Sequence, residues 1–314
     1  MENKLISIVS HCYNEEENVT ELYEQVKAIF SDQLNDYEYE HIYIDNASTD
    51  KTVELLKDIA KKDKNLKIIV NSRNFGHIRS PIHAIMQTKG DAVITFVADL
   101  QDPPELFIDF LRAYEEGYDI VLAIRESSEE SGLIYKVRGF YYRLLKRISD
   151  TEIYENYTGY GLYDRKIVQA LQKMPDAYPF FRGMIAEIGY KVKKIPFHQP
   201  IRTRGNTSQN FYSLYDTAIL GLINNSKVLL RLSIFISFIV GLLSIVVGVF
   251  YLFIKLMYWE SLSLGLAPLL IGGSLMFSVL LFFIGILGEY IGQIYTQTLN
   301  RPLVFEKERI NFDE

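Results

Sequence analysis

The stretch LISIVSHCYNEEEN, residues 5–18, contains the two features that decide the fold of this chain. Residues 5–10 form an apolar run with the length of one buried β-strand, and the residues after them are polar and acidic. Apolar side chains then recur at helical spacing over residues 16–30. The chain thus passes from a buried strand through a polar turn into a helix, which begins an α/β fold if the unit repeats.

The same strand and helix unit recurs up to residue 124. We expect strands at residues 40–44, 66–70, 92–97 and 118–124, and helices at residues 50–62, 78–88 and 104–115. Pro103 and Pro104 suit the start of the last helix. This alternation predicts an α/β fold with a mixed, mostly parallel sheet and flanking helices. Ligands of such sheets bind where the strands end.

The composition argues against several classes of protein. A formal net charge of −6 over 314 residues does not suit a general nucleic-acid-binding protein, which would carry a basic surface. Cys12 is the only cysteine, so an intramolecular disulfide and a cysteine-based zinc cluster are excluded. The N-terminus lacks the basic start and long apolar run of a signal peptide. We therefore expect residues 1–210 to form a cytoplasmic domain.

Two long uncharged stretches predict membrane-spanning helices. Residues 232–254 and 264–288 have no charged side chain over 23 and 25 positions, enough to cross a bilayer. A short link makes them an antiparallel hairpin within residues 232–290. Basic side chains flank the outer ends of this hairpin, at Lys227, Arg231, Arg301, Lys307 and Arg309. The positive-inside rule then predicts a multi-pass protein of the cytoplasmic membrane with both termini in the cytoplasm. Two buried helices of a soluble core are the alternative.

The segments on either side of the hairpin complete the predicted organisation. Apolar side chains recur at helix-like spacing over residues 211–231. This pattern predicts a juxtamembrane amphipathic helix lying on the bilayer, with a plain connecting helix as the alternative. We expect residues 291–314 to form a cytoplasmic C-terminal tail.

Acidic and amide side chains follow the first four predicted strands and should converge on one edge of the sheet. The chain has no glycine-rich dinucleotide or triphosphate motif there. Clustered carboxylates need a cation between themselves and an anionic diphosphate, so we expect a divalent ion with oxygen ligands, Mg²⁺ or Mn²⁺. For Asp50 and Asp102, a role as a helix cap or turn residue is an equal alternative.

Four segments at these strand ends resemble motifs of glycosyltransferase family 2. They are residues 13–16 (Tyr-Asn-Glu-Glu), 45–50 (Asp-Asn-Ala-Ser-Thr-Asp), 73–77 (Arg-Asn-Phe-Gly-His) and 98–104 (Ala-Asp-Leu-Gln-Asp-Pro-Pro). The family transfers sugars from nucleotide diphosphates and has the GT-A fold, a Rossmann-like α/β fold. Over nearly its whole length, the chain most resembles the membrane-anchored bacterial branch related to dolichyl-phosphate mannose synthase and polyprenyl-phosphate glycosyltransferases.

The resemblance implies residues that bind the donor nucleotide. Tyr13, Glu15 and Asp45 would hold the nucleoside, which in this family is most often uridine. Arg73 and Asn74 would help to shape the nucleotide pocket. The donor implied by the resemblance is therefore a nucleotide-sugar, most often a UDP-sugar.

The resemblance also implies the residues that act on phosphate. Asp99 and Gln101 would bind the divalent metal and, through it, the diphosphate. Arg202 and Arg204 correspond to a basic loop that meets phosphate groups near the membrane, because a guanidinium group binds phosphate oxygens in pairs. A solvated basic turn near anionic lipid is the alternative for these arginines. For a lipid hydroxyl acceptor, which needs a general base, Asp102 is the candidate.

The chain departs from the family pattern at several positions. Asn46 stands where a second aspartate is usual, and Val97 stands where the first aspartate of the metal region is usual. Residues 156–161 lack the usual acidic and arginine side chains, and Ser208 or Gln209 replaces a lysine. These changes indicate a distinct subgroup with altered metal and acceptor contacts.

The resemblance implies an inverting glycosyltransferase of the cell envelope. It would move a sugar from a UDP-sugar to a polyprenyl phosphate, such as undecaprenyl phosphate, at the cytoplasmic membrane face. A phosphate acceptor is already an anion at pH 7, so arginines matter more than a base, and Arg182 would join Arg202 and Arg204. One alternative is transfer to a lipid hydroxyl with Asp102 as base. The other is an inactive membrane-anchored protein that binds nucleotide-sugar.

The resemblance implies further partners besides donor, acceptor and membrane. Small two-helix anchors in related proteins associate, which predicts a homo-oligomer, either a dimer or a tetramer. A downstream flippase and a second glycosyltransferase would process the glycosyl lipid. The sequence does not identify the sugar, because sugar selectivity depends on the shape of the pocket.

Overall fold

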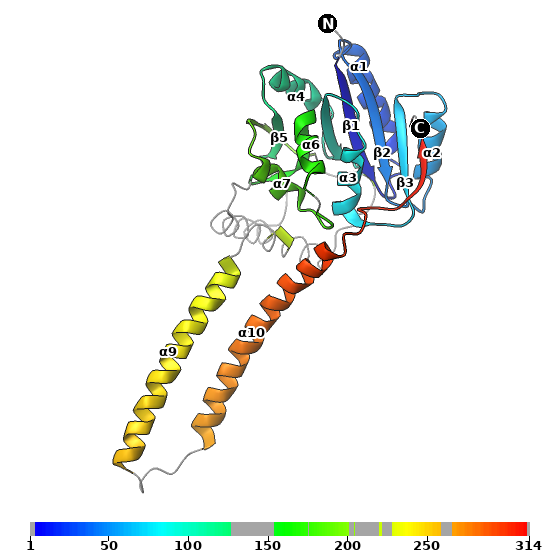
Figure 1. The fold of residues 1–314 in the computed structure, drawn as a ribbon. Coiled ribbons are helices and arrows are strands. Elements are labelled where there is room, and N and C mark those ends of the chain that lie inside the picture. Colours follow the sequence, from blue (N-terminus) through cyan, green and yellow to red (C-terminus); the bar gives the residue numbers. More distant parts are fainter. Residues whose placement is uncertain are drawn as a thin grey trace.

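The computed structural model describes residues 4–126, 154–174, 176–200, 204, 220–221, 228–258 and 266–312. Within these residues, one eight-stranded sheet has the order β7-β5-β6-β4-β1-β2-β3-β8 (Figure 1). The strands are β1 Leu5–Cys12, β2 Glu38–Asp45, β3 Leu66–Asn71, β4 Ala92–Val97, β5 Ile120–Arg125, β6 Tyr157–Asp164, β7 Val192–Phe197 and β8 Glu306–Ile310.

The centre of the sheet is parallel, as predicted. β1 pairs in parallel with both β2 and β4, and β2 pairs in parallel with β3. β6 lies antiparallel between β4 and β5, and β8 lies antiparallel to β3. The register places Cys12 opposite Asp45 and His11 opposite Val97, so these parallel strands end side by side. The predicted mixed, mostly parallel α/β sheet is confirmed.

Helices cover both faces of the sheet, because side chains of successive strand residues point to opposite faces. Ile8 packs with the cluster that contains Leu22 and Phe110, whereas Val9 packs with the cluster that contains Ile85 and Val168. The first cluster is covered by α1 Val19–Asp32, α2 Thr52–Ala60 and α4 Leu106–Glu115. The second is covered by α3 Gly76–Met86, α6 Arg165–Gln172 and α7 Phe181–Ile188.

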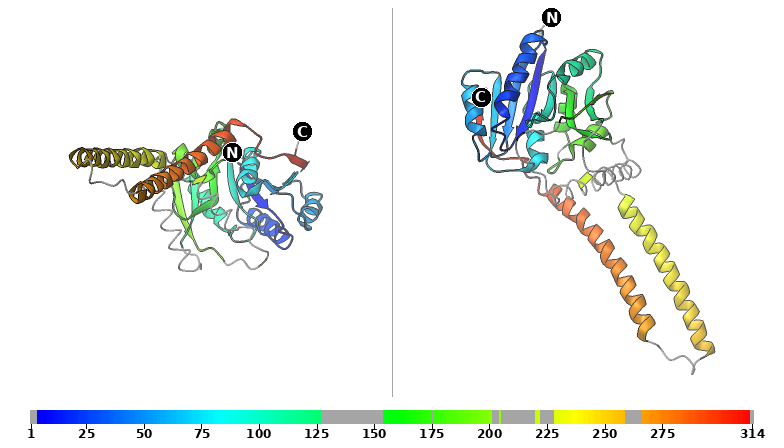
Figure 2. Two further views of the ribbon diagram at one scale, coloured as in Figure 1. Left: turned by 90° about the horizontal axis from the view of Figure 1, so that it is seen from below. Right: turned by 180° about the vertical axis from the view of Figure 1, so that it is seen from behind.

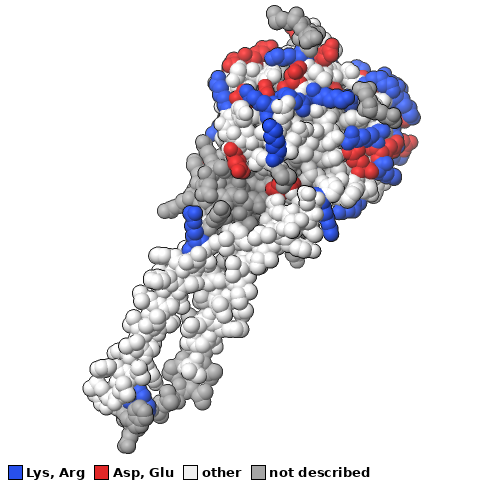
Figure 3. Space-filling model, viewed as in Figure 1, with Lys and Arg blue, Asp and Glu red and all other residues white. Residues whose placement is uncertain are grey.

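Two long apolar helices project from one end of the α/β domain (Figures 1 and 2). They are α9 Val228–Met257 and α10 Leu266–Thr298. The candidate spans Leu230–Met257 and Gly272–Thr298 have mean hydropathies of 2.7 and 2.0, and neither is buried within the protein. Both are long enough to cross a bilayer. Figure 3 shows charged side chains over the α/β domain and few along the two helices, which indicates association with a membrane.

The carboxyl edge of the parallel strands faces the two long helices. β1 begins near the N-terminus, at the end of the domain far from α9 and α10, and runs toward them (Figures 1 and 2). β2, β3 and β4 run in the same direction as β1. The polar turns that follow these strands therefore lie on the membrane-proximal side of the domain.

The chain after α10 returns to the sheet, which the sequence analysis did not predict. β8 pairs with β3, with Ile310 opposite Ile68, and lies beside α2 in Figure 1. The predicted helix at residues 211–231 lies outside the described residues except at 220–221 and 228–231, where the chain is helical.

Candidate active site

The turns after β1 and β2 are joined by hydrogen bonds at the carboxyl edge. Asn14 has a φ of 56°, in the left-handed region that asparagine tolerates better than most residues. Its backbone N–H donates to Ser48 Oγ (2.8 Å), and its Oδ1 accepts from the backbone N–H of Thr49 (2.8 Å). The two turns therefore form one platform around the half-buried Tyr13.

Glu15 is a buried carboxylate held in this platform. Its backbone N–H donates to Thr52 Oγ1 (2.9 Å), and its side chain accepts from Asn18 Nδ2 (2.6 Å). Asn18 directly precedes α1, so the first turn of that helix fixes the orientation of the carboxylate. Tyr13 and Glu15 thus lie on the turn after β1, which is bonded to the turn that follows Asp45 at the end of β2.

Asp45 is fully buried at the end of β2. Its Oδ2 accepts from the backbone N–H of Ser48 (2.9 Å), and its Oδ1 accepts from the Ser48 hydroxyl. Burial raises the pKa of Asp45, although the hydrogen bonds from Ser48 oppose that rise. Ser48 therefore fixes the Asp45 carboxylate through both of its oxygens.

Asn46 explains one departure from the family pattern. Its Nδ2 donates to Asn74 Oδ1 (2.8 Å) and to the carbonyl of Gly76 (3.2 Å). Its Oδ1 accepts from the backbone N–H of Phe75 (2.8 Å) and from Asn71 Nδ2 (3.1 Å). An ionised aspartate only accepts hydrogen bonds, so it would lose both donations. The amide at this position ties the turn after β2 to the turn after β3.

Arg73 and Asn74 lie exposed on that second turn, where the structure brings them next to Asn46. The Arg73 guanidinium lies 4.0 Å from the centre of the Phe75 ring, and its Nη1 donates to the carbonyl of Asn74 (3.0 Å). Asn74 Oδ1 also accepts from the backbone N–H of Gly76 (2.8 Å). The side chain of Asn74 therefore helps to shape its own loop.

Asp99, Gln101 and Asp102 follow β4 in a turn with strained backbone. Leu100 has a φ of 61°, a conformation that costs free energy for a large side chain. The backbone N–H of Gln101 donates to Asp99 Oδ1 (3.1 Å), and Gln101 Nε2 donates to the carbonyl of Pro200 (3.2 Å). Asp102 is 3% exposed and its Oδ2 accepts from the backbone N–H of Val97 (3.2 Å). Burial and then the negative charge of Asp99 raise the pKa of Asp102 to about 7.

This acidic turn fits a divalent cation that takes some of its ligands from a substrate. Among the residues that the structure describes, no group of three or more His, Cys, Asp or Glu side chains is arranged to hold a metal. The turn does offer the carboxylate of Asp99 and the amide oxygen of Gln101, which are the oxygen ligands that Mg²⁺ and Mn²⁺ accept. The mutual repulsion of Asp99 and Asp102 would be relieved by a bound cation.

Arg204 also reaches the carboxyl edge, at the start of α1. Its Nη1 lies 2.6 Å from Glu21 Oε2 and donates to the carbonyl of Glu17 (3.3 Å). Its side chain is 49% exposed, so this ion pair is weak. Arg202 lies outside the described residues, as do Ser208 and Gln209.

Two histidines near these turns were not assigned a role by the sequence analysis. The Nδ1 atom of His11 is buried, with no hydrogen-bond partner in the described part of the chain. Burial, and then the nearby His77, lower the pKa of His11 to about 4. Burial, and then the positive charge of Arg182 on α7, lower the pKa of His77. In the sequence, the only indication that His11 lies near the site is its position directly before Cys12 and Tyr13.

The altered segment at residues 156–161 is tightly packed rather than open. A Cβ atom on Gly161 would lie 2.3 Å from the carbonyl oxygen of Val121, so no other residue fits there without a backbone shift. Tyr160 is buried, and its hydroxyl donates to the carbonyl of Pro103 (2.5 Å). The close contact with Val121 leaves no room for an arginine at position 161. Through Tyr160, strand β6 instead supports the turn that carries Asp102.

The sequence profile described as Glycosyl transferase family 2 matches residues 7–172, which include every described site residue named above from Tyr13 to Asp102. The chain belongs to glycosyl transferase family 2. It is similar to the uncharacterized glycosyltransferase YkcC of Bacillus subtilis, with 31% identity over 95% of this chain and 91% of that protein. It is also similar to the bactoprenol glucosyl transferase of Shigella phage SfX, with 30% identity over 97% of this chain and 99% of that protein.

A solved structure also aligns with the glycosyltransferase. The glucosyl-3-phosphoglycerate synthase of Mycobacterium tuberculosis, crystallised with Mn²⁺, UDP and phosphoglyceric acid, aligns with a TM-score of 0.48 and 18% identity. That alignment covers 68% of this chain and 75% of the synthase. The family membership, rather than this alignment, shows that the protein is a glycosyltransferase.

Proposed function

We propose that this glycosyltransferase transfers a sugar from a UDP-sugar to a polyprenyl phosphate at the cytoplasmic face of the membrane, with inversion at the anomeric carbon. One observation carries the proposal. The edge of the sheet where β2 ends at Asp45 and β4 leads into the turn of Asp99 faces the end of the domain from which α9 and α10 project (Figure 1). A water-soluble donor and a membrane-bound acceptor would meet at this edge.

A relative supports a lipid acceptor. The bactoprenol glucosyl transferase of Shigella phage SfX aligns with 97% of this chain, a share that requires the two long helices to be included. Two apolar helices hold the domain beside a substrate that does not leave the bilayer. We place both termini in the cytoplasm, with the catalytic domain at residues 1–210 and the hairpin at residues 232–290.

On the donor side, Tyr13, Glu15 and Asp45 form the acceptor-rich platform on which the nucleoside would lie, next to Arg73 and Asn74. The buried Asp45 carboxylate is held by Ser48, so little free energy is required to order it when ligand binds. These contacts support a nucleoside as the ligand of the platform.

On the diphosphate side, Asp99 and Gln101 would hold Mg²⁺ or Mn²⁺. When bound, such an ion neutralises the charge that builds up on the leaving diphosphate. Leu100, with its strained φ of 61°, lies between Asp99 and Gln101, and the backbone N–H of Gln101 donates to Asp99 Oδ1. Asp102 supports this turn through the hydrogen bond from Val97.

On the acceptor side, the reaction depends more on correct positioning of the acceptor phosphate than on a general base. A phosphate oxygen of the acceptor attacks the anomeric carbon, and the bond from that carbon to the diphosphate oxygen breaks. The nucleoside diphosphate leaves on the opposite side, which inverts the anomeric centre. A phosphomonoester has its second pKa near 6, so at pH 7 it is already a nucleophile. Arg202 and Arg204 would orient it, with Arg204 exchanging its ion pair with Glu21 for the phosphate.

Transfer to a lipid hydroxyl is the second candidate, and the state of Asp102 favours it. Burial and the adjacent Asp99 raise the pKa of Asp102 to about 7, which is the range suited to a general base at neutral pH. An alcohol acceptor would require such a base, whereas a phosphate acceptor would not.

An acceptor competition experiment tests the proposal. The full-length chain in liposomes would receive a panel of UDP- and GDP-sugars with polyprenyl phosphate or diacylglycerol, in Mg²⁺, Mn²⁺ or chelator. Mass spectrometry of the lipids should find a glycosyl polyprenyl phosphate that requires the metal. A glycosylated diacylglycerol would favour the second candidate. No transfer from any donor would overturn both.

A further inference from the structure

The segment that leaves α10 and enters β8 lies against the loop that carries Arg73 and Asn74. We call residues 302–306 the return segment and residues 72–76 the donor loop. The backbone N–H of Ser72 donates to the carbonyl of Phe305 (2.8 Å), and the rings of Phe305 and Phe75 are 6.2 Å apart. Arg79, on α3, donates from Nη2 to the carbonyl of Pro302 (2.5 Å). The return segment is thus bonded on both sides of the donor loop.

Phe75 is the centre of this contact. It is 6% exposed, and three groups surround its ring: the guanidinium of Arg73 at 4.0 Å, that of Arg79 at 5.4 Å, and the ring of Phe305. Val304 of the return segment is also buried. Arg73 and Phe305 both lie against the ring of Phe75, so the return segment can influence the position of Arg73 through that ring.

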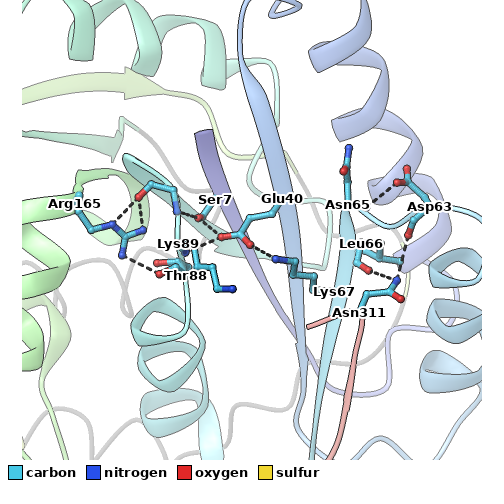
Figure 4. Close-up of polar contacts among 11 residues, drawn as sticks. Ser7, Glu40, Asp63, Asn65, Leu66, Lys67, Thr88, Lys89, Arg165 and Asn311 are labelled. Atoms are coloured by element: carbon cyan, nitrogen blue, oxygen red, sulfur yellow. Dashed lines mark hydrogen bonds and ion pairs between the residues drawn. The ribbon is translucent and has the colours of Figure 1, made fainter. Parts of the chain in front are cut away.

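The return segment is itself firmly held at its far end. Glu306 lies 2.5 Å from His83 Nε2, and Lys57 Nζ lies 2.6 Å from Glu308 Oε2. Asn311, in the left-handed region with a φ of 61°, donates from Nδ2 to the carbonyls of Ala60 and Leu66, both at 2.8 Å. Figure 4 shows Asn311 reaching from the C-terminal segment to Leu66 and Asp63. At its near end the segment follows the end of α10 at Thr298.

We propose that Phe305 is a positioning residue that holds the donor loop in the shape that receives the donor nucleotide. This inference rests on the proposed function, in which Arg73 and Asn74 border the nucleotide pocket. Asn46 holds the same loop from the side of β2, so the loop is fixed between two supports.

Hydrogen exchange of the full-length chain tests the contact without requiring activity. In Phe305→Ala, amides of the donor loop should exchange about fivefold faster, since an aromatic contact and the order it imposes on the Ser72 hydrogen bond are lost. Phe312→Ala is the control within the same C-terminal segment, because Phe312 contacts Lys67 and Arg309 and packs against the core cluster of Val9 instead of the donor loop. Phe305 is 58% exposed, so its removal leaves the core intact. Unchanged exchange in Phe305→Ala, or an equal change in Phe312→Ala, would overturn the proposal.

Kinetics then test the role. The KM for the donor should rise about fivefold in Phe305→Ala with kcat nearly unchanged, and Phe305→Tyr, which keeps the ring, should restore it. If the wild-type chain binds UDP with Mn²⁺ but transfers no sugar, the proposed function fails while the Kd of UDP for the same variants still decides this inference. A fall in kcat alone, or no rescue by Phe305→Tyr, would refute positioning.

Discussion

Glu40 and Asp102 are two carboxylates at opposite edges of the same sheet, and they are almost equally buried, at 4% and 3% exposed. Glu40 lies near the start of β2, at the amino edge. It accepts from Lys67 Nζ (2.6 Å), Ser7 Oγ (2.5 Å) and the backbone N–H of Lys89 (2.8 Å), as Figure 4 shows. Asp102 lies after β4, at the carboxyl edge, where its neighbour is another carboxylate, Asp99.

The two carboxylates are almost equally buried, yet their pKa values shift in opposite directions. Burial alone would raise the pKa of Glu40, yet the hydrogen bonds from Lys67, Lys89 and Ser7 together lower it. At Asp102, burial and the charge of Asp99 raise the pKa to about 7. The amino edge supplies its own positive partner and is structural, whereas the carboxyl edge accumulates negative charge that a cation or ligand can balance.

The strongest test of this contrast is Asp99→Asn at the carboxyl edge. The change removes a charge that would hold the divalent ion, so turnover should fall on the order of a thousandfold while the fold is retained. Initial rates across a range of Mg²⁺ and Mn²⁺ concentrations would measure the loss. Asp109→Asn, on the exposed side of α4, should have little effect. Wild-type turnover in Asp99→Asn would remove Asp99 from the metal site.

At the amino edge, Glu40→Gln should reduce stability rather than catalysis. It leaves Lys67, which is 13% exposed, without its charged partner, at a cost of about 3 to 5 kcal/mol in unfolding free energy. Urea unfolding followed by the tyrosine circular dichroism of the detergent-solubilised chain would detect it. Glu38→Gln, exposed in the same strand, is the control. If both variants were equally stable, the amino edge would not depend on this ion pair.

His41, midway along β2, predicts how stability depends on pH. Its Nε2 lies 2.8 Å from Ser10 Oγ, and burial lowers its pKa from 6.5 to about 3. Below pH 6.5, His41 therefore binds a proton in the unfolded chain but stays neutral in the folded chain until the pH approaches 3. Stability from this residue is complete above pH 6.5 and falls toward pH 3, with a loss of about 2 to 3 kcal/mol at pH 4.5. His41→Gln should flatten this part of the pH profile, and an unchanged slope would contradict the assignment.

The smallest expected effect concerns Asn46, at the carboxyl edge. Asn46→Asp keeps the size of the side chain but removes its donations to Asn74 and Gly76, so the donor loop should loosen. The KM for the donor should rise about fivefold, equivalent to about 1 kcal/mol, with a similar kcat. Asn35→Asp, at an exposed position, provides the comparison. A lower KM would mean that the family's aspartate serves this chain as well as the amide does.

The central sheet was predictable because its strands are buried on both faces. Such strands appear as continuous apolar runs, and residues 5–10, 66–70 and 92–97 become β1, β3 and β4 nearly within the predicted limits. The two long helices were equally clear, since residues 232–254 and 264–288 contain no charged side chain. Parallel pairing then places the ends of these strands side by side, so the grouping of the site residues followed from the order of the motifs.

The remaining features depend on tertiary contacts that leave little trace in the sequence. β6 reads Tyr-Thr-Gly-Tyr-Gly-Leu-Tyr-Asp, and its Gly161 reflects a close approach to Val121 rather than a strand preference. β8 reads Glu-Lys-Glu-Arg-Ile, with the charges typical of an edge strand and no apolar run. The four hydrogen bonds of Asn46 and the contact of Phe305 with Phe75 join segments far apart in the chain.

The origin of β8 sets an order of events during synthesis. The edge of β3 is covered by residues 306–310, which leave the ribosome only after both α9 and α10 have been made. Until then, β3 presents unpaired N–H and C=O groups that can pair with another chain. The last strand of the sheet therefore pairs with β3 only after both long helices have been synthesised. A nascent chain that stops short of Glu306 would carry a bare sheet edge, which is a mark that quality-control proteases and chaperones can recognise.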